Sequence, residues 1–326
     1  MKPAVVMLWL LTAGCAAAGG DGPRAYVTNE RDGTITVIDI ERDTVIGVIQ
    51  VGARPRGIRL GADGLLYVAR STRMRQPYHP PDNRLVAVDP RRGRIVAEYD
   101  AGTDPEQLDI GYEGTRLYTS NEDAGTATVY DLDSRRPIAT LVVGIEPEGV
   151  TTSPDGRWVY VTAETSNSVS VIDVERNQVV ASFMVGARPR DTGFSPDGSR
   201  AYVSAEVGRT LSVVDTRSHT VVATIPLVAD GDVKPVGVVV APDGRTVYVA
   251  LGRANAVAVI DATTNQMVAT IPVGSRVWGL GITRDGRKLY AANGLSNDIS
   301  VINTEQRRVI KTLAGGDGPW GIAIQN

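Results

Sequence analysis

Cysteine and histidine are almost absent from this chain. Its 326 residues include one cysteine, Cys15, and two histidines, His79 and His219. A catalytic thiol, a serine–histidine pair or a zinc ion held by histidines needs more of these side chains than the chain offers. A phosphate-binding loop, a GxSxG nucleophile turn and an HExxH zinc motif are also missing from the sequence. These absences favour a protein that binds over one that catalyses, and no catalytic residue is predicted.

Phenylalanine and excess charge are scarce as well. Only two Phe occur, so Val, Ile, Leu and Ala must fill the interior of a chain that is 42% hydrophobic. That fraction is enough for a full-sized core and argues against a disordered protein. The 34 basic and 37 acidic residues leave a formal net charge of −3 without a long run of one sign. Electrostatic capture of nucleic acid or of an anionic membrane surface is therefore not expected.

The first twenty residues differ from the rest of the chain. Soon after Lys2 comes the apolar run AVVMLWLL, which is too short to span a bilayer. We interpret residues 1–20 as an export signal that precedes a mature domain of residues 21–326. The sequence Leu-Thr-Ala-Gly-Cys that ends at Cys15 resembles a bacterial lipobox, in which the cysteine is lipidated. An ordinary signal-peptidase site at Ala16–Ala18 is the alternative, so an anchored and a free protein both stay open.

Behind this segment, a short phrase that opens with tyrosine recurs seven times. The tyrosines are spaced 41 to 51 residues apart: Tyr26, Tyr67, Tyr118, Tyr160, Tyr202, Tyr248 and Tyr290. Such a period is typical of a repeat protein. The repeat from Arg157 to Gly198 contains four β-type runs, WVYVT, SVSVIDV, VVASFMVG and TGFS, separated by turn residues. Seven repeats of four strands predict an all-β, seven-bladed β-propeller.

The two ends of this region predict how the ring closes. It starts with a tyrosine strand at residues 25–27 and ends, at residues 319–326, with an apolar run of the kind that precedes such a strand. We expect the C-terminal strand to complete the N-terminal blade, which removes the open sheet edges. An Asp or Asn that we expect to cap a turn ends the second run of each repeat, namely Asp39, Asp89, Asp131, Asp173, Asp215, Asp261 and Asn303.

The loop that leads into the innermost strand changes its charge from repeat to repeat. In a propeller these loops surround one mouth of the central channel, so we predict a ligand- or partner-binding site there. Its members are Arg54, Arg56, Asp104, Glu106, Glu146, Glu148, Arg188, Arg190, Lys234, Arg276, Trp278 and Trp320. The turns after the tyrosine strands are expected at the same face and add Glu30, Glu122, Glu164 and Glu206. The alternative is that opposite charges on neighbouring blades neutralise each other as ion pairs.

An insertion and a set of acids also belong to this face. The insertion Arg70–Pro81 lengthens the second repeat, and it either covers the mouth, contacts a partner or is an inert surface loop. No cofactor is predicted, but calcium with oxygen ligands leaves little trace in a sequence. The candidate calcium ligands are Glu30, Glu122, Glu148 and Glu164.

The tyrosine strands (YVTN, YTSN, YVTA, YVSA) and the SPDG or APDG turns resemble the YVTN-type β-propeller repeats. The phrases GARPRGI, TDPEQL, EPEGV, KPVGV, RVWGL and PWGI follow in an order similar to that of the exported propeller proteins associated with PQQ-dependent alcohol catabolism. The resemblance covers residues 24–326. It implies a periplasmic protein that accompanies a quinoprotein alcohol dehydrogenase and its cytochrome c partner. It implies neither PQQ binding nor a catalytic residue.

We therefore predict a monomeric periplasmic binding or accessory protein, free or anchored through a lipidated Cys15. Its small-molecule ligand or protein partner is expected at the charged mouth. A lactonase-like hydrolase on the same scaffold is the second hypothesis, and a surface-tethered interaction protein is the third. The Arg70–Pro81 insertion departs from the family pattern, so the resemblance does not extend to the shape of the mouth.

Overall fold

The computed structural model describes residues 22–71, 83–111 and 114–326. Within these ranges it contains 28 β-strands and two short 3-10 helices. The predicted export signal with Cys15 and residues 72–81 of the insertion lie outside the described residues. Among the residues that are described, no helix is both long and apolar enough to cross a membrane.

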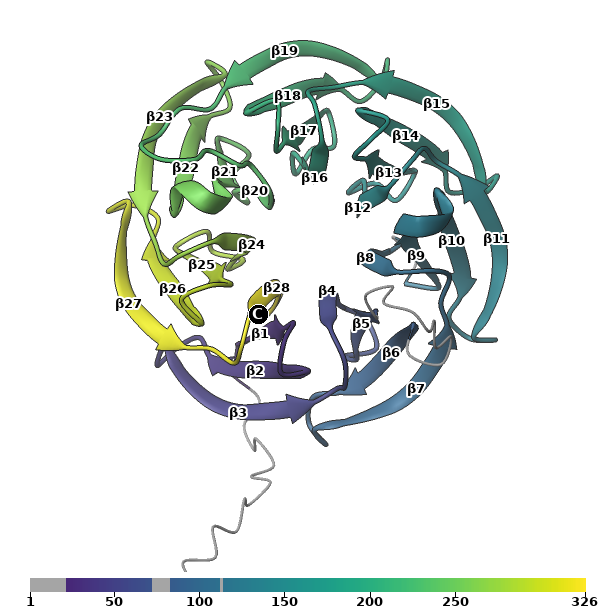
Figure 1. Ribbon diagram of the computed structural model, residues 1–326, viewed down its shortest axis with the longest axis horizontal. Helices are drawn as coiled ribbons and strands as arrows, with labels where there is room; N and C mark the ends of the chain where they lie inside the picture. Colours follow the sequence, from purple (N-terminus) through teal and green to yellow (C-terminus); the bar gives the residue numbers. More distant parts are fainter. Residues whose placement is uncertain (1–21, 72–82, 112–113) are drawn as a thin grey trace, which may run out of the picture.

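The strands form seven antiparallel, four-stranded sheets arranged as blades around a central axis (Figure 1). This arrangement confirms the predicted seven-bladed β-propeller. The innermost strands are β28 (Pro319–Gln325), β4 (Pro55–Leu60), β8 (Pro105–Ile110), β12 (Pro147–Thr152), β16 (Pro189–Phe194), β20 (Val238–Val240) and β24 (Val277–Ile282). The second strands, which carry the repeated tyrosines, are β1 (Arg24–Asn29), β5 (Leu66–Arg70), β9 (Arg116–Asn121), β13 (Trp158–Ala163), β17 (Arg200–Ala205), β21 (Thr246–Ala250) and β25 (Lys288–Asn293).

Two further rings of strands lie outside these. The third strands are β2 (Thr34–Asp39), β6 (Arg84–Asp89), β10 (Thr126–Asp131), β14 (Ser168–Asp173), β18 (Thr210–Asp215), β22 (Ala256–Asp261) and β26 (Asp298–Asn303). The outermost strands are β3 (Thr44–Gln50), β7 (Arg94–Asp100), β11 (Arg136–Val142), β15 (Gln178–Met184), β19 (Thr220–Pro226), β23 (Gln266–Pro272) and β27 (Arg308–Ala314). The two 3-10 helices follow second strands: η2 (Glu122–Ala124) and η3 (Gly252–Ala254).

Strand β28 closes the ring by pairing with β1. In this antiparallel pair Ala25 lies opposite Ile324, and Tyr26 lies opposite Ala323. Because β1 also pairs with β2, the last strand of the chain and its first three strands make one sheet. The predicted closure is therefore confirmed.

Apolar side chains fill the spaces between neighbouring blades. One core cluster joins Tyr290 of the last blade to Ala25 and Ile38 of the first. The Tyr290 hydroxyl also donates a hydrogen bond to Asp43 of that first blade at 2.8 Å. Four of the repeated tyrosines have almost no exposed surface: Tyr26, Tyr118, Tyr160 and Tyr290. The tyrosines thus belong to the scaffold, and they contribute apolar area and polar contacts at once.

The Asp or Asn that ends each third strand caps the following turn. The Asp39 carboxylate, for example, accepts a hydrogen bond from the backbone N–H of Arg42 at 2.9 Å. The six equivalent residues accept the same kind of bond from a backbone N–H two or three residues later. The predicted structural role of this repeated acid is confirmed.

Candidate functional site

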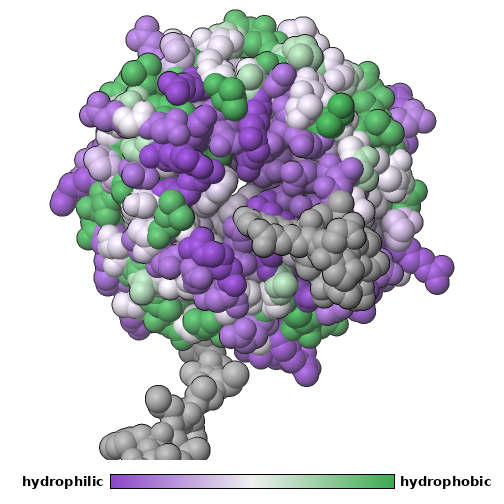
Figure 2. All heavy atoms as spheres, viewed as in Figure 1, coloured by the Kyte–Doolittle hydropathy of each residue, from purple (hydrophilic) through white to green (hydrophobic). Residues whose placement is uncertain are grey.

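The predicted mouth residues lie where the innermost strands begin, at one end of the channel. Figure 2 shows mostly hydrophilic residues around the central hollow on this face. The residue before the innermost strand has a positive φ, between 42° and 75°, in six of the seven blades: Arg54, Asp104, Glu146, Arg188, Arg276 and Gly318. A left-handed backbone is uncommon for residues other than glycine. Because this left-handed turn recurs around the ring, it is a property of the repeat. It places the five non-glycine residues at the mouth of the channel.

Hydroxyl groups on the tyrosine strands hold the backbone of the mouth. Thr28 donates a hydrogen bond to the Arg56 carbonyl at 2.7 Å, and Ser120 donates one to the Glu148 carbonyl at 2.7 Å. Ser204 makes the equivalent bond further round the ring. Each of these bonds joins one blade to the next. The Thr or Ser of the tyrosine phrase is therefore a blade-to-blade tie.

The first ionic network of the mouth joins three blades through Arg54 and Arg56, and we call it the Arg54–Arg56 network. Arg54 lies 3.0 Å from Glu30 and 2.8 Å from Asp104, measured between charged N and O atoms. Arg56 pairs with Glu30 at 3.1 Å and also with the fully buried Glu106. Burial raises the pKa of Glu30, but Arg56 and Arg54 more than offset that effect, so its pKa is lowered. Each acid of this network is thus neutralised by an arginine.

The second ionic network is built in the same way around Arg188 and Arg190, and we call it the Arg188–Arg190 network. Arg190 pairs with Glu148 at 2.8 Å, with Glu164, and with Glu206 at 3.5 Å. Arg188 lies 2.7 Å from Glu164 and 3.3 Å from Glu206. The side chain of Arg190 is 9% exposed, whereas that of Arg188 is 48% exposed. Both arginine pairs of the mouth are therefore engaged in ion pairs between blades, as the alternative hypothesis predicts.

The two predicted tryptophans form an aromatic part of the mouth. The rings of Trp278 and Trp320 stack with their centroids 6.1 Å apart and their planes at 28°. Arg276 lies 4.2 Å from the Trp278 ring centroid, and Arg190 lies 5.6 Å from it. Arg56 lies 5.6 Å from the Trp320 ring centroid. These cation–π contacts couple the tryptophans to both ionic networks.

Glu122, in η2, differs from the acids that the two ionic networks hold. It takes part in none of the ion pairs among the described residues, and its carboxylate lies within 4.8 Å of ligand oxygens on Asp104 and Glu106. Burial, followed by the negative charges of Glu148 and Asp104, raises its pKa to about 7. The other three predicted calcium ligands pair with arginines instead: Glu30, Glu148 and Glu164. Since Asp104 and Glu106 are also paired with arginines, Glu122 is the member of this group of three carboxylates that has no arginine partner among the described residues.

Two predicted mouth residues lie at the edge of these networks. Glu146 is exposed and accepts a hydrogen bond from the Thr165 hydroxyl. Lys234 is half-buried and forms no ion pair with an acid in the described parts of the chain. The structure therefore places every predicted mouth residue at this face but brings only some of them together.

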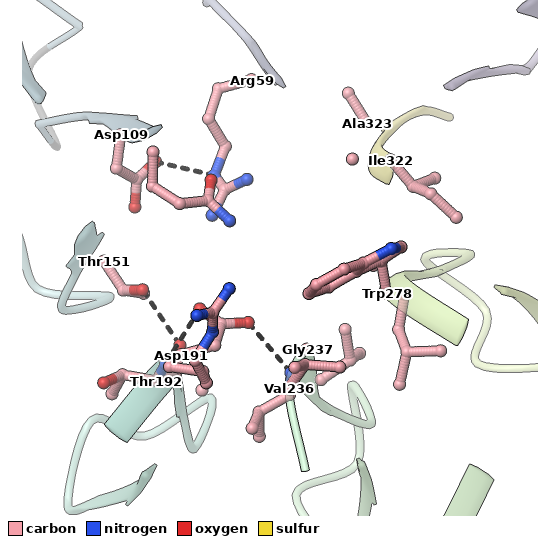
Figure 3. A pocket seen from close by; sticks show the side chains of 18 of the residues that line it. Arg59, Asp109, Thr151, Asp191, Thr192, Val236, Gly237, Trp278, Ile322 and Ala323 are labelled. Carbon is pink, nitrogen blue, oxygen red and sulfur yellow. Dashed lines mark hydrogen bonds and ion pairs between the residues drawn. The ribbon is translucent and has the colours of Figure 1, made fainter. Parts of the chain in front are cut away.

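Behind the mouth, the channel holds a cavity of about 490 Å³ lined by the innermost strands (Figure 3). Strands β4, β8, β12 and β16 form one side, which we call the polar wall. Its polar residues are Arg59, Gln107, Asp109, Glu148, Thr151, Thr152, Arg190, Asp191 and Thr192. Strands β20, β24 and β28 form the apolar wall. Its larger side chains are Val236, Val238, Val239, Val240, Trp278, Leu280, Trp320, Ile322 and Ile324.

An ion pair stabilises the polar wall. Arg59 Nε lies 3.2 Å from Asp109 Oδ1, so the pair joins β4 to β8. The second carboxylate oxygen of Asp109 accepts a hydrogen bond from the backbone N–H of Thr152, on β12, at 2.8 Å. The two charges balance each other within the wall, and the contact spans three blades.

Asp191, on β16, is the carboxylate of the polar wall that has no basic partner among the described residues. Its Oδ1 accepts a hydrogen bond from the backbone N–H of Thr192, and its Oδ2 accepts one from that of Val238, each at 2.9 Å. Burial raises the pKa of Asp191, and the two N–H bonds and Arg59 offset only part of that effect. The side chain remains partly exposed to the cavity, where it projects from the side that faces Trp278 (Figure 3).

Sequence analysis alone does not single out Arg59, Asp109 or Asp191. A glycine follows the mouth residue in five innermost strands, where a Cβ would lie 2.3–2.9 Å from backbone atoms of the next blade: Gly57, Gly149, Gly237, Gly279 and Gly321. Gln107 takes this position in the third blade and Asp191 takes it in the fifth, and these two exceptions were the available signal. Next to Asp191, the neighbouring innermost strand β20 is only three residues long. The Asp191 carboxylate accepts the Val238 N–H in place of close strand packing.

The described histidine, His219, does not contribute to the cavity. It lies in the turn between β18 and β19, and its ring packs edge-on against Trp158 at 4.8 Å between centroids. Its Nδ1 shares a hydrogen bond with the Tyr160 hydroxyl at 2.7 Å. Burial lowers its pKa. His219 is therefore part of the packing between two blades.

Two family models match separate parts of the chain. The model of the lactonase, 7-bladed beta-propeller family matches residues 177–312. The model of the choice-of-anchor I domain matches residues 27–188. No curated protein matches the chain.

Solved structures with the same fold cover nearly all of the described chain. A chain of Kuenenia stuttgartiensis hydrazine synthase is similar at 22% identity and a TM-score of 0.76, with 86% of this chain and 92% of that chain covered. A functionally unknown protein from Desulfotomaculum acetoxidans is similar at 17% identity and a TM-score of 0.77, with 93% and 99% covered. At these identities the likeness shows the fold alone. The chain is thus a seven-bladed β-propeller with one lactonase-like portion and one portion like a choice-of-anchor domain.

Proposed function

We propose that this chain is an exported, non-catalytic binding protein whose small-molecule ligand occupies the channel cavity. The observation that carries this proposal is the cavity itself. It measures about 490 Å³, lies directly behind the mouth, and sets an apolar wall against a polar one. Small-molecule sites typically have this size, and they combine apolar contact area with a few polar groups that orient the ligand.

The chemistry of the lining favours binding over catalysis. No Ser, Cys, His, Lys or Tyr lines the cavity in the described part of the chain. The lining therefore lacks the side chains that most nucleophile–base pairs use, and threonine hydroxyls and carboxylates are what remains. The arginines that the sequence places at the mouth pair with acids of neighbouring blades, so they stabilise the ring that frames the cavity.

An accessory role in PQQ-dependent alcohol oxidation fits the sequence resemblance, with a quinoprotein dehydrogenase or its cytochrome c as the partner. The position of the N-terminal strand suits such a role. Strand β1 begins at Arg24, on the face opposite the mouth, and Pro23 O accepts a hydrogen bond from Ile40 N there. A tether through the preceding segment would therefore leave the mouth facing the periplasm.

The ligand is tested by isolating the protein from the periplasm of its host grown on an alcohol. Native mass spectrometry should show a small molecule that leaves on denaturation. Val239→Trp should abolish this mass, because Val239 takes the channel-facing position that Arg59 and Asp109 hold on their strands. Val142→Trp is the matched control, since Val142 is 80% exposed on β11. A bare protein, or equal loading of both variants, would contradict the proposal. Affinity capture from the same extract should retain the dehydrogenase or cytochrome c.

A lactonase-like hydrolase is the second candidate, because the lactonase model matches residues 177–312. That range supplies β16, β20 and β24 to the cavity. In this case Asp191 would be the general base that activates a water molecule. Metal analysis combined with a panel of lactones separates the two candidates. Turnover that Asp191→Asn abolishes would replace the binding function by a hydrolytic one.

A surface-tethered interaction protein is the third candidate, and the choice-of-anchor match over residues 27–188 favours an exported protein. Mass spectrometry of the membrane fraction tests the tether. A diacylated N-terminal peptide beginning at Cys15 would support it, whereas an unmodified N-terminus after Ala18 would exclude it.

A further inference from the structure

We propose that the ligand of the channel cavity is a small organic cation whose ammonium group binds Asp191 and whose hydrocarbon part lies against the apolar wall. This inference rests on the proposed function, because it names the ligand class for the same cavity. It uses three features of the lining: its charge balance, the acceptor positions that Asp191 has left, and the division into two walls.

The charges that line the cavity leave one carboxylate in excess. Arg59 is balanced by Asp109 at 3.2 Å, and Arg190 is balanced by Glu148 at 2.8 Å. Asp191 is the fifth charged residue of the lining and has no such partner among the described residues. An anionic ligand would have to displace an existing ion pair to reach an arginine. A cationic ligand instead completes a pair with Asp191.

The geometry of Asp191 leaves room for a donor from the cavity. Each of its oxygens accepts one backbone N–H bond, and a carboxylate offers about four acceptor positions in total. Those two bonds also fix the direction of the carboxylate. A ligand ammonium group, which carries up to three N–H donors, would fill the remaining positions with charge-assisted hydrogen bonds.

The opposite wall fits the hydrocarbon part of such a ligand. Trp278, Leu280 and Ile322 line it, and Figure 3 shows Trp278 and Asp191 projecting into the cavity from different sides. Removing a hydrocarbon chain from water contributes about 0.8 kcal/mol per buried CH₂ group. A ligand with one charged end and one apolar end therefore uses both walls.

Isothermal titration calorimetry with three molecules of equal length tests the inference: n-hexylammonium, 1-hexanol and hexanoate. We expect hexylammonium to bind at least tenfold more tightly than hexanol, and hexanoate not to bind. Asp191→Asn should weaken hexylammonium at least tenfold and hexanol much less, because the amide keeps the size of the side chain and loses its charge. Its single oxygen can accept only one of the two backbone N–H bonds, so the variant also loses one of these contacts. Asp243→Asn, on an exposed turn, should change neither affinity.

Two results would overturn the inference. One is the absence of hexylammonium binding to the wild-type protein, and the other is binding that Asp191→Asn leaves intact. Thermal unfolding of both variants checks that each remains folded. Tight binding of hexanol or hexanoate in place of the cation would also overturn the ligand class while leaving a small-molecule function standing. If the protein isolated from the periplasm carries no small molecule, that result would contradict the proposed binding function itself.

Discussion

The mouth and the cavity behind it both contain arginines and carboxylates, but these groups are paired differently in the two places. At the mouth, Arg54, Arg56, Arg188 and Arg190 all pair with carboxylates on neighbouring blades. In the cavity, Asp191 has no basic partner among the described residues and faces open space instead. Charged groups that neutralise one another hold blades together, whereas a charged group left over is available to a ligand. The proposed ligand site therefore lies at Asp191 in the cavity and not among the paired charges of the mouth.

The largest effect is expected from removing a strand that both regions share. β28 contributes Trp320 to the mouth and Ile322 to the cavity, and it closes the ring on β1. Deleting residues 319–326 should remove most of the stability of the domain, about 5–15 kcal/mol, because the first blade loses its innermost strand. Urea unfolding followed by circular dichroism measures this. Deleting Asn326 alone is the control and should cost less than about 0.5 kcal/mol. An unchanged midpoint for the longer deletion would refute the closure.

Arg190→Met should destabilise the protein more than Arg188→Met does. Removing the guanidinium leaves Glu148 buried without a partner and leaves Glu164 with Arg188 alone. Breaking a buried pair in this way costs about 3–5 kcal/mol. Arg188→Met should cost at most about 1 kcal/mol, because the Arg188 side chain is 48% exposed. The free energy of unfolding of both variants tests the difference. Equal, small losses would mean that the Arg188–Arg190 network does not stabilise the ring.

The fold and the mouth were predictable from sequence because both repeat. Seven copies of a tyrosine strand set the blade number, and the loops before the innermost strands could be placed on one face. The ion pairs were not predictable, since the sequence puts Arg54 and Asp104 at the same face without giving the distance between them. The role of Asp191 was harder to predict than the ion pairs. It stands where five other blades have a packing glycine, and the neighbouring strand β20 is short after the long loop of residues 228–233.

Glu122→Gln should change how the stability of the protein depends on pH. Burial and the nearby Glu148 and Asp104 raise the pKa of Glu122 to about 7, while Arg56 and Arg190 oppose this. The folded state therefore keeps a proton that the unfolded chain loses above its ordinary pKa of 4.5, so stability falls as pH rises from 4.5 to 7. The variant should gain about 2 kcal/mol over wild type at pH 8 and almost nothing at pH 4.5. Urea unfolding at both pH values measures the gain. A gain that does not change with pH would contradict the assignment.

Thr28→Val should have the smallest effect. It removes the hydroxyl that donates to the Arg56 carbonyl at 2.7 Å and accepts the Gly321 N–H at 2.9 Å, and it keeps the shape of the side chain. The loss of these two bonds costs about 1–2 kcal/mol. Ala69, Ala250 and Ala292 occupy the equivalent position in three other blades, so the fold tolerates the absence of this hydroxyl. A loss above about 3 kcal/mol would show that the mouth depends on this tie more than on its ion pairs.

A crystal structure of the protein with n-hexylammonium tests most directly whether the cavity or the mouth is the binding site. We predict the ammonium nitrogen within about 3 Å of an Asp191 carboxylate oxygen, and the alkyl chain against Trp278 and Leu280. An ammonium group bound at Glu122 or Asp104, with the cavity unchanged, would contradict the account and return the site to the mouth.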